Sequence, residues 1–285
     1  MLKSARMDGC TTCMAVRSHT SSFASPLDTG ADADRETRAA SLKQTMPAAR
    51  VAIITHPDLF LCTDEIIWVP LASSYDGPIV KVEMVRSPFV KTIFLDSDTL
   101  ILGTLEPLFG LMEAFDLALA HEPLRGWNYE TSAAAAFVEL NTGVVVFRKS
   151  PQMEAFFTDW KNRYYLMRDQ KSLKNDQPSF RETLWFHRNL RHATLTTEFH
   201  LITGKGASTT WHVKLLHGRD DLPGIAASIN REVGARTYNP GWGVIMSPRG
   251  RKYWIKDYLR LTIRFWRVLL FPTSLRQRPT PVRWW

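Results

Sequence analysis

Two aspartates, separated by one residue, follow the most apolar strand that the sequence predicts. Residues 92–95 are typical of a buried strand, and Asp96 and Asp98 come directly after it in "KTIFLDSDTLILGTLEPLF" (91–109). Side chains at positions i and i+2 of an extended chain point the same way, so the two carboxylates are expected to converge while Ser97 faces away. Two like charges this close repel each other unless a cation lies between them or one of them is protonated.

This carboxylate pair favours a site for a divalent cation. Oxygen ligands suit a hard ion such as Mg²⁺ or Mn²⁺, and such an ion usually takes phosphate oxygens as well as protein ligands. Ligand sites in an open α/β sheet lie outside the carboxyl ends of the strands. The sequence therefore predicts a metal that in turn holds a diphosphate. The competing interpretation is a solvated turn in which Asp98 caps the next segment.

The elements that must position this pair alternate between strand and helix. A weak strand at 12–19 and a helix at 34–47 are followed by a more regular pattern. The predicted strands are 51–56, a short apolar run at 65–71, 92–95, 116–122, a strand pair or one bent strand at 137–150, 196–202 and 213–216. The predicted helices are 77–87, 104–115, 151–167 and 177–187. Alternation of this kind is typical of a mostly parallel, Rossmann-like sheet with helices on both faces.

The composition is that of a globular protein. The chain has 285 residues, of which 45% are hydrophobic and 22% charged, and its three cysteines cannot form a disulfide framework. No signal peptide or membrane span is predicted, and the cysteine usage favours a cytoplasmic protein. We expect a poorly structured segment at 1–33, one domain at 34–248 and a separate tail at 249–285.

The tail holds the excess of positive charge. Residues 249–285 contain ten Lys or Arg and one acid, whereas the rest of the chain is close to neutral. Lys252, Lys256, Arg260 and Arg264 recur every four residues, which predicts a basic stripe on an amphipathic helix. Such a helix favours peripheral attachment to an anionic membrane surface. The alternative is a last helix packed on the domain. A near-neutral body argues against nucleic acid as a partner.

Six segments resemble the nucleotide-diphospho-sugar transferases, the glycosyltransferases of type A fold, and most of all the bacterial polysaccharide-associated group and its glycogenin-like relatives. They follow the family's order over roughly residues 40–220: "SLKQTMPAARVAIITH", "KVEMVRSPFVKTIFLDSDTLILGTLEPLF", "FDLALAHE", "LNTGVVVFRKSPQMEAFFTDW", "NDQPSFRETLW" and "VKLLHGR". The resemblance implies a nucleotide-sugar donor, usually a uridine diphosphate (UDP) sugar, and a divalent metal, usually Mn²⁺. It also implies a glycan or lipid-linked acceptor in polysaccharide biosynthesis.

The resemblance also implies a metal site. Asp98 matches the direct metal ligand, and Asp96 matches a residue that ligates the metal or binds the donor. His217 matches the histidine that completes the site, although a histidine at this position could instead simply cap a strand end.

Further roles follow for the donor and the transferred sugar. Asp176 and Gln177 match a pair that faces the transferred sugar, although Asp176 could instead cap a helix. Glu122 and Asp176 are the candidate bases if the reaction inverts. Lys81 matches a basic residue facing the phosphates, although a solvated helix lysine fits equally. The expected donor contacts are Lys81, Asp96, Ser97, Asn141, Thr142, Gly143 and Arg219.

Two features depart from the family pattern, and two other functions fit parts of the chain. Segment 12–19 is a weak match to the strand that holds the nucleotide base, and "HGRDDLPG" (217–224) lacks a lysine that the glycogenin-like members have. A non-catalytic nucleotide-sugar-binding protein on the same fold is therefore an alternative. A haloacid-dehalogenase-like phosphatase, with Asp96 as nucleophile and Asp98 as acid or base, is a more distant one.

Overall fold

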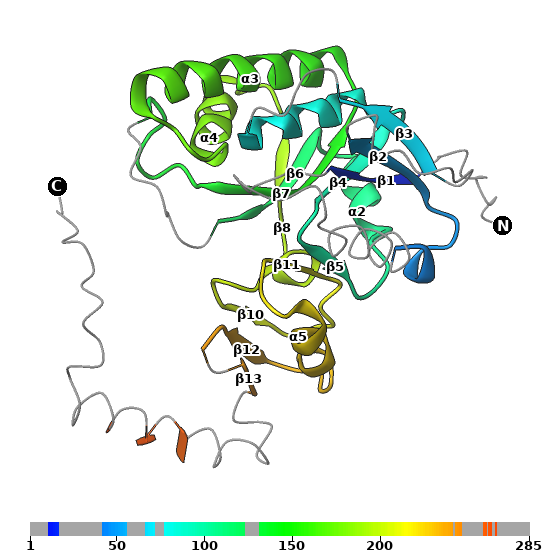
Figure 1. The fold of residues 1–285 in the computed structure, drawn as a ribbon, viewed down its shortest axis with the longest axis vertical. Coiled ribbons are helices and arrows are strands. Elements are labelled where there is room, and N and C mark those ends of the chain that lie inside the picture. The colour runs from blue at the N-terminus through cyan, green and yellow to red at the C-terminus, as the bar shows by residue number, and fades with distance from the viewer. Residues whose placement is uncertain are drawn as a thin grey trace, which may run out of the picture.

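The computed structural model describes most of the predicted domain. The described residues are 11–16, 42–55, 66–71, 77–122, 131–241, 243–246, 259, 260, 262, 263 and 266. Their main feature is a seven-stranded sheet with the strand order β3-β2-β1-β4-β7-β6-β8 (Figure 1). Its strands are β1 (Thr11–Val16), β2 (Arg50–Thr55), β3 (Ile66–Pro70), β4 (Lys91–Asp96), β6 (Leu117–His121), β7 (Leu140–Arg148) and β8 (His192–Leu195).

The sheet is mostly parallel, as predicted. β1 pairs in parallel with β2 and β4, β2 with β3, and β6 with β8, whereas β7 is antiparallel to both of its neighbours. The chain runs outward from β1 to β3 and then crosses to β4 on the other side of β1. Val16 and Asp96 are register partners, so the carboxyl ends of β1 and β4 lie side by side at this reversal. Open α/β sheets bind their ligands at such a switch point.

The first strand confirms one expectation and corrects another. A weak strand was expected at 12–19, and residues 11–16 form β1 at the switch point, hydrogen-bonded on both sides, within a segment that was expected to be poorly structured. The sequence of this strand mixes polar and apolar residues, so its pattern is weak. Pairing with β2 and β4 supplies the stability that the pattern does not show.

Helices cover both faces of the sheet, as Figure 1 shows. The 3₁₀-helix η2 (Gly77–Arg86), α3 (Pro151–Lys171) and α4 (Gln177–Phe186) lie on one face, and the shorter α2 (Pro107–Leu111) on the other. Neighbouring residues of β4 alternate between two apolar clusters, with Phe94 in the first and Ile93 and Leu95 in the second. Both faces are thus buried, which explains the nearly continuous apolar run of this strand.

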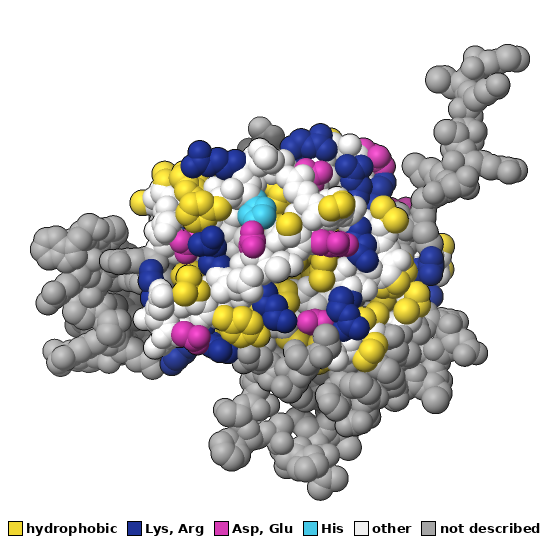
Figure 2. Space-filling view, turned by 90° about the horizontal axis from the view of Figure 1, so that it is seen from above, with side chains coloured by type: hydrophobic (Ala, Val, Ile, Leu, Met, Phe, Trp, Pro, Cys, Tyr) yellow, Lys and Arg dark blue, Asp and Glu magenta, His cyan; other side chains and the backbone are white. Residues whose placement is uncertain are grey.

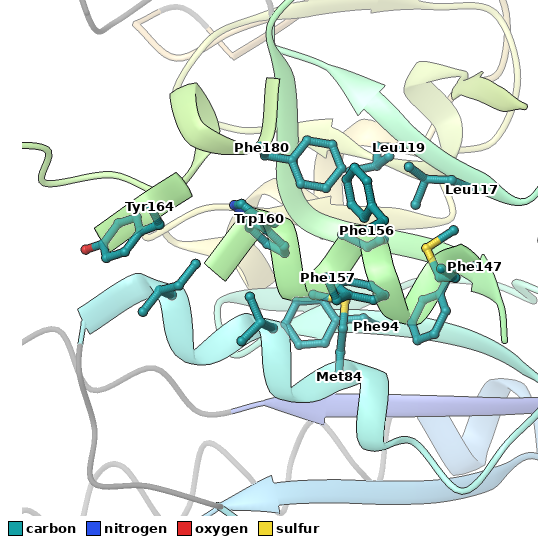
Figure 3. Close-up of a cluster of buried hydrophobic side chains, with 14 of the residues drawn as sticks. Met84, Phe94, Leu117, Leu119, Phe147, Phe156, Phe157, Trp160, Tyr164 and Phe180 are labelled. Carbon is teal, nitrogen blue, oxygen red and sulfur yellow. The ribbon is translucent and has the colours of Figure 1, made fainter. Parts of the chain in front are cut away.

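Aromatic side chains fill the core beneath α3 and α4 (Figure 3). The rings of Phe156 and Trp160 on α3 both meet Phe180 on α4 edge to face, with centroids 5.2 and 4.9 Å apart. The indole Nε1 of Trp160 donates to the hydroxyl of Ser179 at 3.1 Å. This packing fixes the start of α4, which carries two of the predicted site residues.

Several element boundaries differ from the prediction. Segment 77–87 forms a 3₁₀-helix rather than an α-helix, and the helix expected at 104–115 is confined to 107–111. Residues 137–150 contain one strand, β7, whose pairing with β6 shifts register at Leu119 and Ala120. Where a strand was expected at 196–202, β8 has already ended at Leu195, and a short 3₁₀-helix η3 (Thr197–Phe199) is followed by β9 (Leu201–Ile202). Short apolar runs do not fix such boundaries, because tertiary pairing decides them.

Two smaller sheets lie beyond the carboxyl end of β4. One has the order β5-β11-β9, with β5 (Thr99–Ile101) and β11 (Leu215–His217), and the other has the order β10-β12-β13. The second is formed by β10 (Ala207–Thr209), β12 (Arg236–Asn239) and β13 (Gly243–Met246), and α5 (Leu222–Ile229) follows β11. Antiparallel pairing of β5 with β11 sets His217 opposite Thr99.

Most of the predicted tail at 249–285 lies outside the described residues. Those described are helical, and Leu259, Ile263 and Trp266 are 54, 65 and 53% exposed. Spacings of four and three residues put these three side chains on one face of a helix. None of the helices in the described part of the chain is both long and apolar enough to cross a membrane.

On the surface of the domain, basic, acidic and apolar side chains are interspersed over the face that carries α3 (Figure 2).

Candidate functional site

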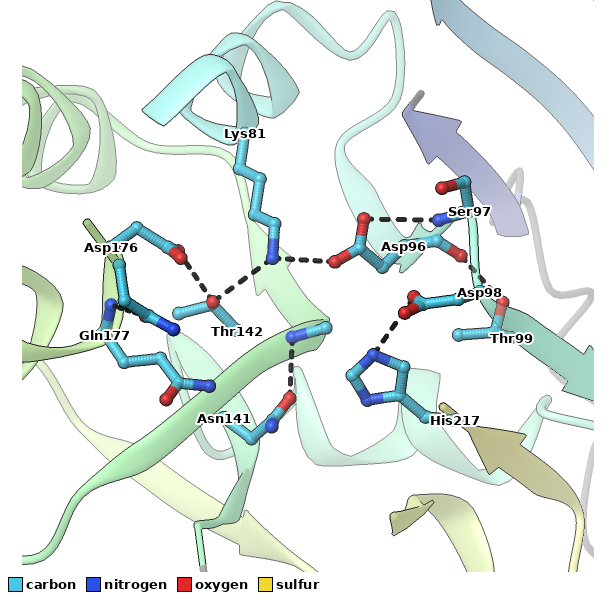
Figure 4. Close-up of polar contacts among 12 residues, drawn as sticks. Lys81, Asp96, Ser97, Asp98, Thr99, Asn141, Thr142, Asp176, Gln177 and His217 are labelled. Carbon is cyan, nitrogen blue, oxygen red and sulfur yellow. Dashed lines mark hydrogen bonds and ion pairs between the residues drawn. The ribbon is translucent and has the colours of Figure 1, made fainter. Parts of the chain in front are cut away.

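The predicted aspartates lie at the carboxyl end of β4 (Figure 4). Asp96 is the last residue of the strand, Ser97 and Asp98 form a turn, and Thr99 begins β5. The Ser97 amide donates to Asp96 Oδ1 at 3.2 Å, and the Thr99 hydroxyl donates to the Asp96 carbonyl at 2.9 Å. The pair therefore converges through a turn and not through the straight i, i+2 geometry of a strand.

His217 meets this turn from the small sheet. Its Nε2 lies 3.2 Å from Asp98 Oδ1, and the Gly218 amide donates to the Asp98 carbonyl at 2.9 Å. The imidazole also lies against Gly143 of β7, where a Cβ atom would come within 2.1 Å of the ring carbon Cε1. Position 143 therefore has to be glycine for the histidine ring to occupy this place.

The three side chains fit a divalent cation. One ligand atom each from Asp96, Asp98 and His217 can be chosen so that all three lie within 4.8 Å of one another. Ligands at about 2.0–2.3 Å from an ion, when on opposite sides of it, are about 4–5 Å apart. Asp98 Oδ1 is buried and, despite the nearby imidazole, has no hydrogen-bond partner among the described residues. A buried carboxylate oxygen that lacks a hydrogen-bond partner is suited to bind a cation.

The Asp98 carboxylate is also held in its ionised form. Burial works to raise its pKa, but the contact with His217 and the charge of that ring hold the pKa well below its usual range. The Asp98 carboxylate is thus available to a cation at neutral pH without prior deprotonation.

Lys81 balances the second aspartate. Its Nζ lies 2.7 Å from Asp96 Oδ2 and 3.4 Å from the hydroxyl of Thr142. Burial alone would lower the pKa of Lys81, but the carboxylates of Asp176 and Asp96 raise it above its ordinary value. The side chain is only 8% exposed on the buried side of η2, which excludes the alternative of a solvated helix lysine.

Asp176 faces Lys81 from the start of α4. Its Oδ2 accepts a hydrogen bond of 2.7 Å from the Thr142 hydroxyl, and burial raises the pKa of its carboxyl. Its side chain makes no capping bond to the helix; the Asn175 side chain instead accepts from the Gln177 amide at 2.8 Å. The capping role that the sequence also allowed for Asp176 is thus not observed, and its carboxyl remains in the site.

Glu122 is the centre of an adjoining polar cluster. Its Oε2 accepts from Asn141 Nδ2 at 2.9 Å and from Gln177 Nε2 at 3.5 Å. Its Oε1 pairs with Lys205 Nζ at 2.5 Å, and Asn141 Oδ1 accepts from the Gly143 amide at 2.8 Å. Both carboxylate oxygens are therefore engaged, which reduces the case for Glu122 as a base.

The structure brings the predicted site residues together, and Arg219 alone among them lies at the exposed rim of the site. Arg219 is mostly exposed, and its Nε is 3.8 Å from Asp98 Oδ2.

The sequence analysis missed two residues of the site, Lys205 and His200. Lys205 lies in a turn between two glycines, and nothing local in the sequence connects it with Glu122. His200, whose Nε2 is 2.8 Å from His217 Nδ1, precedes a strand of two residues that the sequence does not resolve. Burial, followed by the charges of His217 and Lys81, lowers the pKa of His200 well below 6.5.

Comparison with known proteins places the fold. The sequence matches no protein-family model and no curated protein. Among solved structures, galactosyltransferase LgtC in complex with donor and acceptor sugar analogues superposes with a TM-score of 0.52 and 12% identity, over 74% of this chain and 88% of LgtC. An active-site mutant of LgtC gives 0.50 and 11%, over 77% and 94%. Apo mouse xyloside xylosyltransferase 1 gives 0.48 and 13%, over 75% and 99%.

The two superpositions on LgtC confirm the fold class expected from the sequence. The described chain has the fold of the type A glycosyltransferases, that is, of the nucleotide-diphospho-sugar transferases.

Proposed function

We propose that the protein is a metal-dependent glycosyltransferase that moves a sugar from a nucleotide diphosphate sugar, most simply a UDP-sugar, to a hydroxyl of a glycan or lipid-linked acceptor. The observation that carries the proposal is the cluster of Asp96, Asp98 and His217 at the switch point of a type A fold. LgtC, with the same fold, has been solved with donor and acceptor sugar analogues, which supports the same substrate classes here.

In this proposal Asp96, Asp98 and His217 hold Mn²⁺ or Mg²⁺. The ion supplies Lewis-acid stabilisation of the negative charge that builds on the leaving diphosphate. Arg219 lies at the rim beside Asp98, where an exposed guanidinium suits a phosphate. Lys81 pairs with Asp96 and fixes the orientation of its carboxylate.

The polar cluster around Glu122, together with the neighbouring Asp176, is proposed to hold the transferred sugar. Transfer breaks the bond between the anomeric carbon and the diphosphate oxygen, forms a bond to the acceptor oxygen and releases the acceptor's proton. If the reaction inverts the anomeric configuration, Asp176 is better suited than Glu122 to take that proton, because burial raises the pKa of Asp176 whereas both oxygens of Glu122 are engaged. If it retains the configuration, the leaving diphosphate takes the proton. Asn141, Thr142 and Gln177 contribute amide and hydroxyl groups that suit sugar hydroxyls.

The basic tail is proposed to attach the enzyme peripherally to an anionic membrane surface, where lipid-linked acceptors are found. Its ten basic residues favour anionic lipid, and the exposed face of Leu259, Ile263 and Trp266 argues against the alternative of a helix packed on the domain.

The first prediction concerns the metal ligand. Asp98→Asn should reduce transfer by roughly 10²-fold or more, since the lost charge stabilisation amounts to several kcal/mol. The fold should persist, because asparagine has nearly the same size as aspartate and the change opens no cavity. Sugar transfer and UDP release are the measurements, and Asp169→Asn, on the exposed side of α3, is the matched control. Full activity of Asp98→Asn in the presence of chelator would contradict the metal assignment.

The second prediction concerns the close approach at position 143. Gly143→Ala should lower both the melting temperature and the affinity for Mn²⁺, because its methyl group overlaps the His217 ring. The double variant Gly143→Ala/His217→Ala should recover melting temperature without recovering Mn²⁺ binding. Gly110→Ala is the control, since a Cβ atom there meets nothing within 4 Å. Wild-type Mn²⁺ affinity in Gly143→Ala would refute the proposed place of His217.

The third prediction concerns the donor. A UDP-sugar should raise the melting temperature only when Mn²⁺ or Mg²⁺ is present, because the diphosphate is held through the ion. Ligand at 100 times its dissociation constant stabilises the folded state by about 2.7 kcal/mol. A thermal-shift screen of nucleotide sugars with and without metal measures this, with Asp98→Asn as the non-responding control. Equal stabilisation by free sugar without metal would count against the proposal.

The fourth prediction concerns the tail. The intact chain should co-sediment with anionic liposomes, less in high salt, and Leu259→Ser/Ile263→Ser/Trp266→Ser should release it without unfolding. Leu166→Ser, another exposed apolar residue, should have no effect. Binding that is unchanged in the triple variant, or a triple variant that is insoluble, would mean that this face is not the membrane contact.

A further inference from the structure

A second histidine lies directly behind the metal ligand. His200 Nε2 is 2.8 Å from His217 Nδ1, and the two ring centroids are 4.9 Å apart. His200 is 3% exposed, and its other ring nitrogen, Nδ1, is buried without a hydrogen-bond partner among the described residues. The proposed reaction makes no use of this residue.

The small sheet fixes the relative position of the two rings. His200 lies between η3 and β9, and its amide donates to the Thr197 carbonyl at 3.2 Å. β9 then pairs in parallel with β11, with Ile202 as the register partner of His217. The His217 ring is thereby enclosed by Asp98 at Nε2, by Gly143 at Cε1 and by His200 at Nδ1.

The position of the proton on His217 decides whether the ring can bind a cation. An imidazole that ligates through Nε2 must carry its proton on Nδ1, and that proton needs an acceptor. The usual acceptor is a carboxylate, a backbone carbonyl or water. In the described part of this chain, the hydrogen-bond partner of His217 Nδ1 is His200 Nε2.

When both rings are neutral, the histidine pair allows two proton arrangements. In one, His200 Nε2–H donates to His217 Nδ1, and the proton on His217 Nε2 faces Asp98. In the other, His217 Nδ1–H donates to His200 Nε2, and the bare His217 Nε2 faces the space shared with Asp96 and Asp98. Only the second arrangement presents a lone pair to a cation.

We propose that His200 is a positioning residue of the metal centre, which accepts the Nδ1 proton of His217 and so presents Nε2 to the cation. The inference rests on the metal centre of the proposed function. Because the acceptor is a neutral ring, it adds no negative charge behind the two aspartates. It orients the ligand without strengthening the electrostatic hold on the ion.

Two substitutions of His200 by amide side chains of different length test whether His200 accepts the Nδ1 proton of His217. The side-chain amide of His200→Gln reaches about as far as Nε2 of histidine, whereas that of His200→Asn is one carbon shorter. Mn²⁺ affinity is measured from the electron paramagnetic resonance signal of the free ion, at fixed pH and without substrate. His200→Asn should weaken the affinity by roughly tenfold or more, as loss of such a partner usually does. His200→Gln should stay close to wild type, because its amide oxygen can accept the Nδ1 proton.

Controls separate this from a packing effect. Thermal melts without metal report whether each variant is folded, and His212→Asn removes an exposed histidine elsewhere. Wild-type affinity in a folded His200→Asn protein overturns the inference and leaves the metal centre standing. Equal loss in both amide variants also overturns it, because reach then has no effect. If wild-type protein binds Mn²⁺ no better than Asp98→Asn, the proposed metal centre itself fails, and the inference fails with it.

Discussion

The buried ion pair between Lys81 and Asp96 is the interaction on which the site depends. It joins η2 to the end of β4, and the charge of Lys81 also offsets Asp176 on α4. Without it, three carboxylates would face one small space at the switch point. Removing one partner of a buried pair leaves an uncompensated charge, at a cost of about 3–5 kcal/mol. The pair therefore makes it possible for the sheet to gather acidic groups there before any cation arrives.

β7 connects the two halves of the site. It runs antiparallel between β4 and β6, and successive residues point to opposite sides. Thr142 meets Lys81 and Asp176, Asn141 meets Glu122 and Gln177, and Gly143 leaves room for His217. One strand thus sets the spacing between the proposed metal centre and the proposed sugar pocket.

The sequence predicted those parts of the site that depend on local pattern or on family resemblance. Asp96 and Asp98 could be found because they follow a clearly apolar strand. Asp176 could be found only through the resemblance of "NDQPSFRETLW" to the family, because its place before a helix pointed to a capping role instead. Lys205 and His200 could not be found, because their partners are brought to them by pairing among β5, β9 and β11, strands of two or three residues with little pattern of their own. β1 was underestimated for a related reason, since its place at the switch point comes from its neighbours and not from its hydropathy.

The edge-to-edge pairing of β5 with β11 has a thermodynamic consequence. Asp98 follows the main sheet, whereas His217 belongs to the last pairing position of the small one. A cation bound by both would act as a cross-link between the main sheet and the small one. Its measured affinity would then include the free energy of keeping β11 docked, and any ligand of the ion would also protect the amides of the small sheet from solvent exchange. By thermodynamic linkage, occupancy of the cation site and the local stability of the small sheet would therefore rise and fall together.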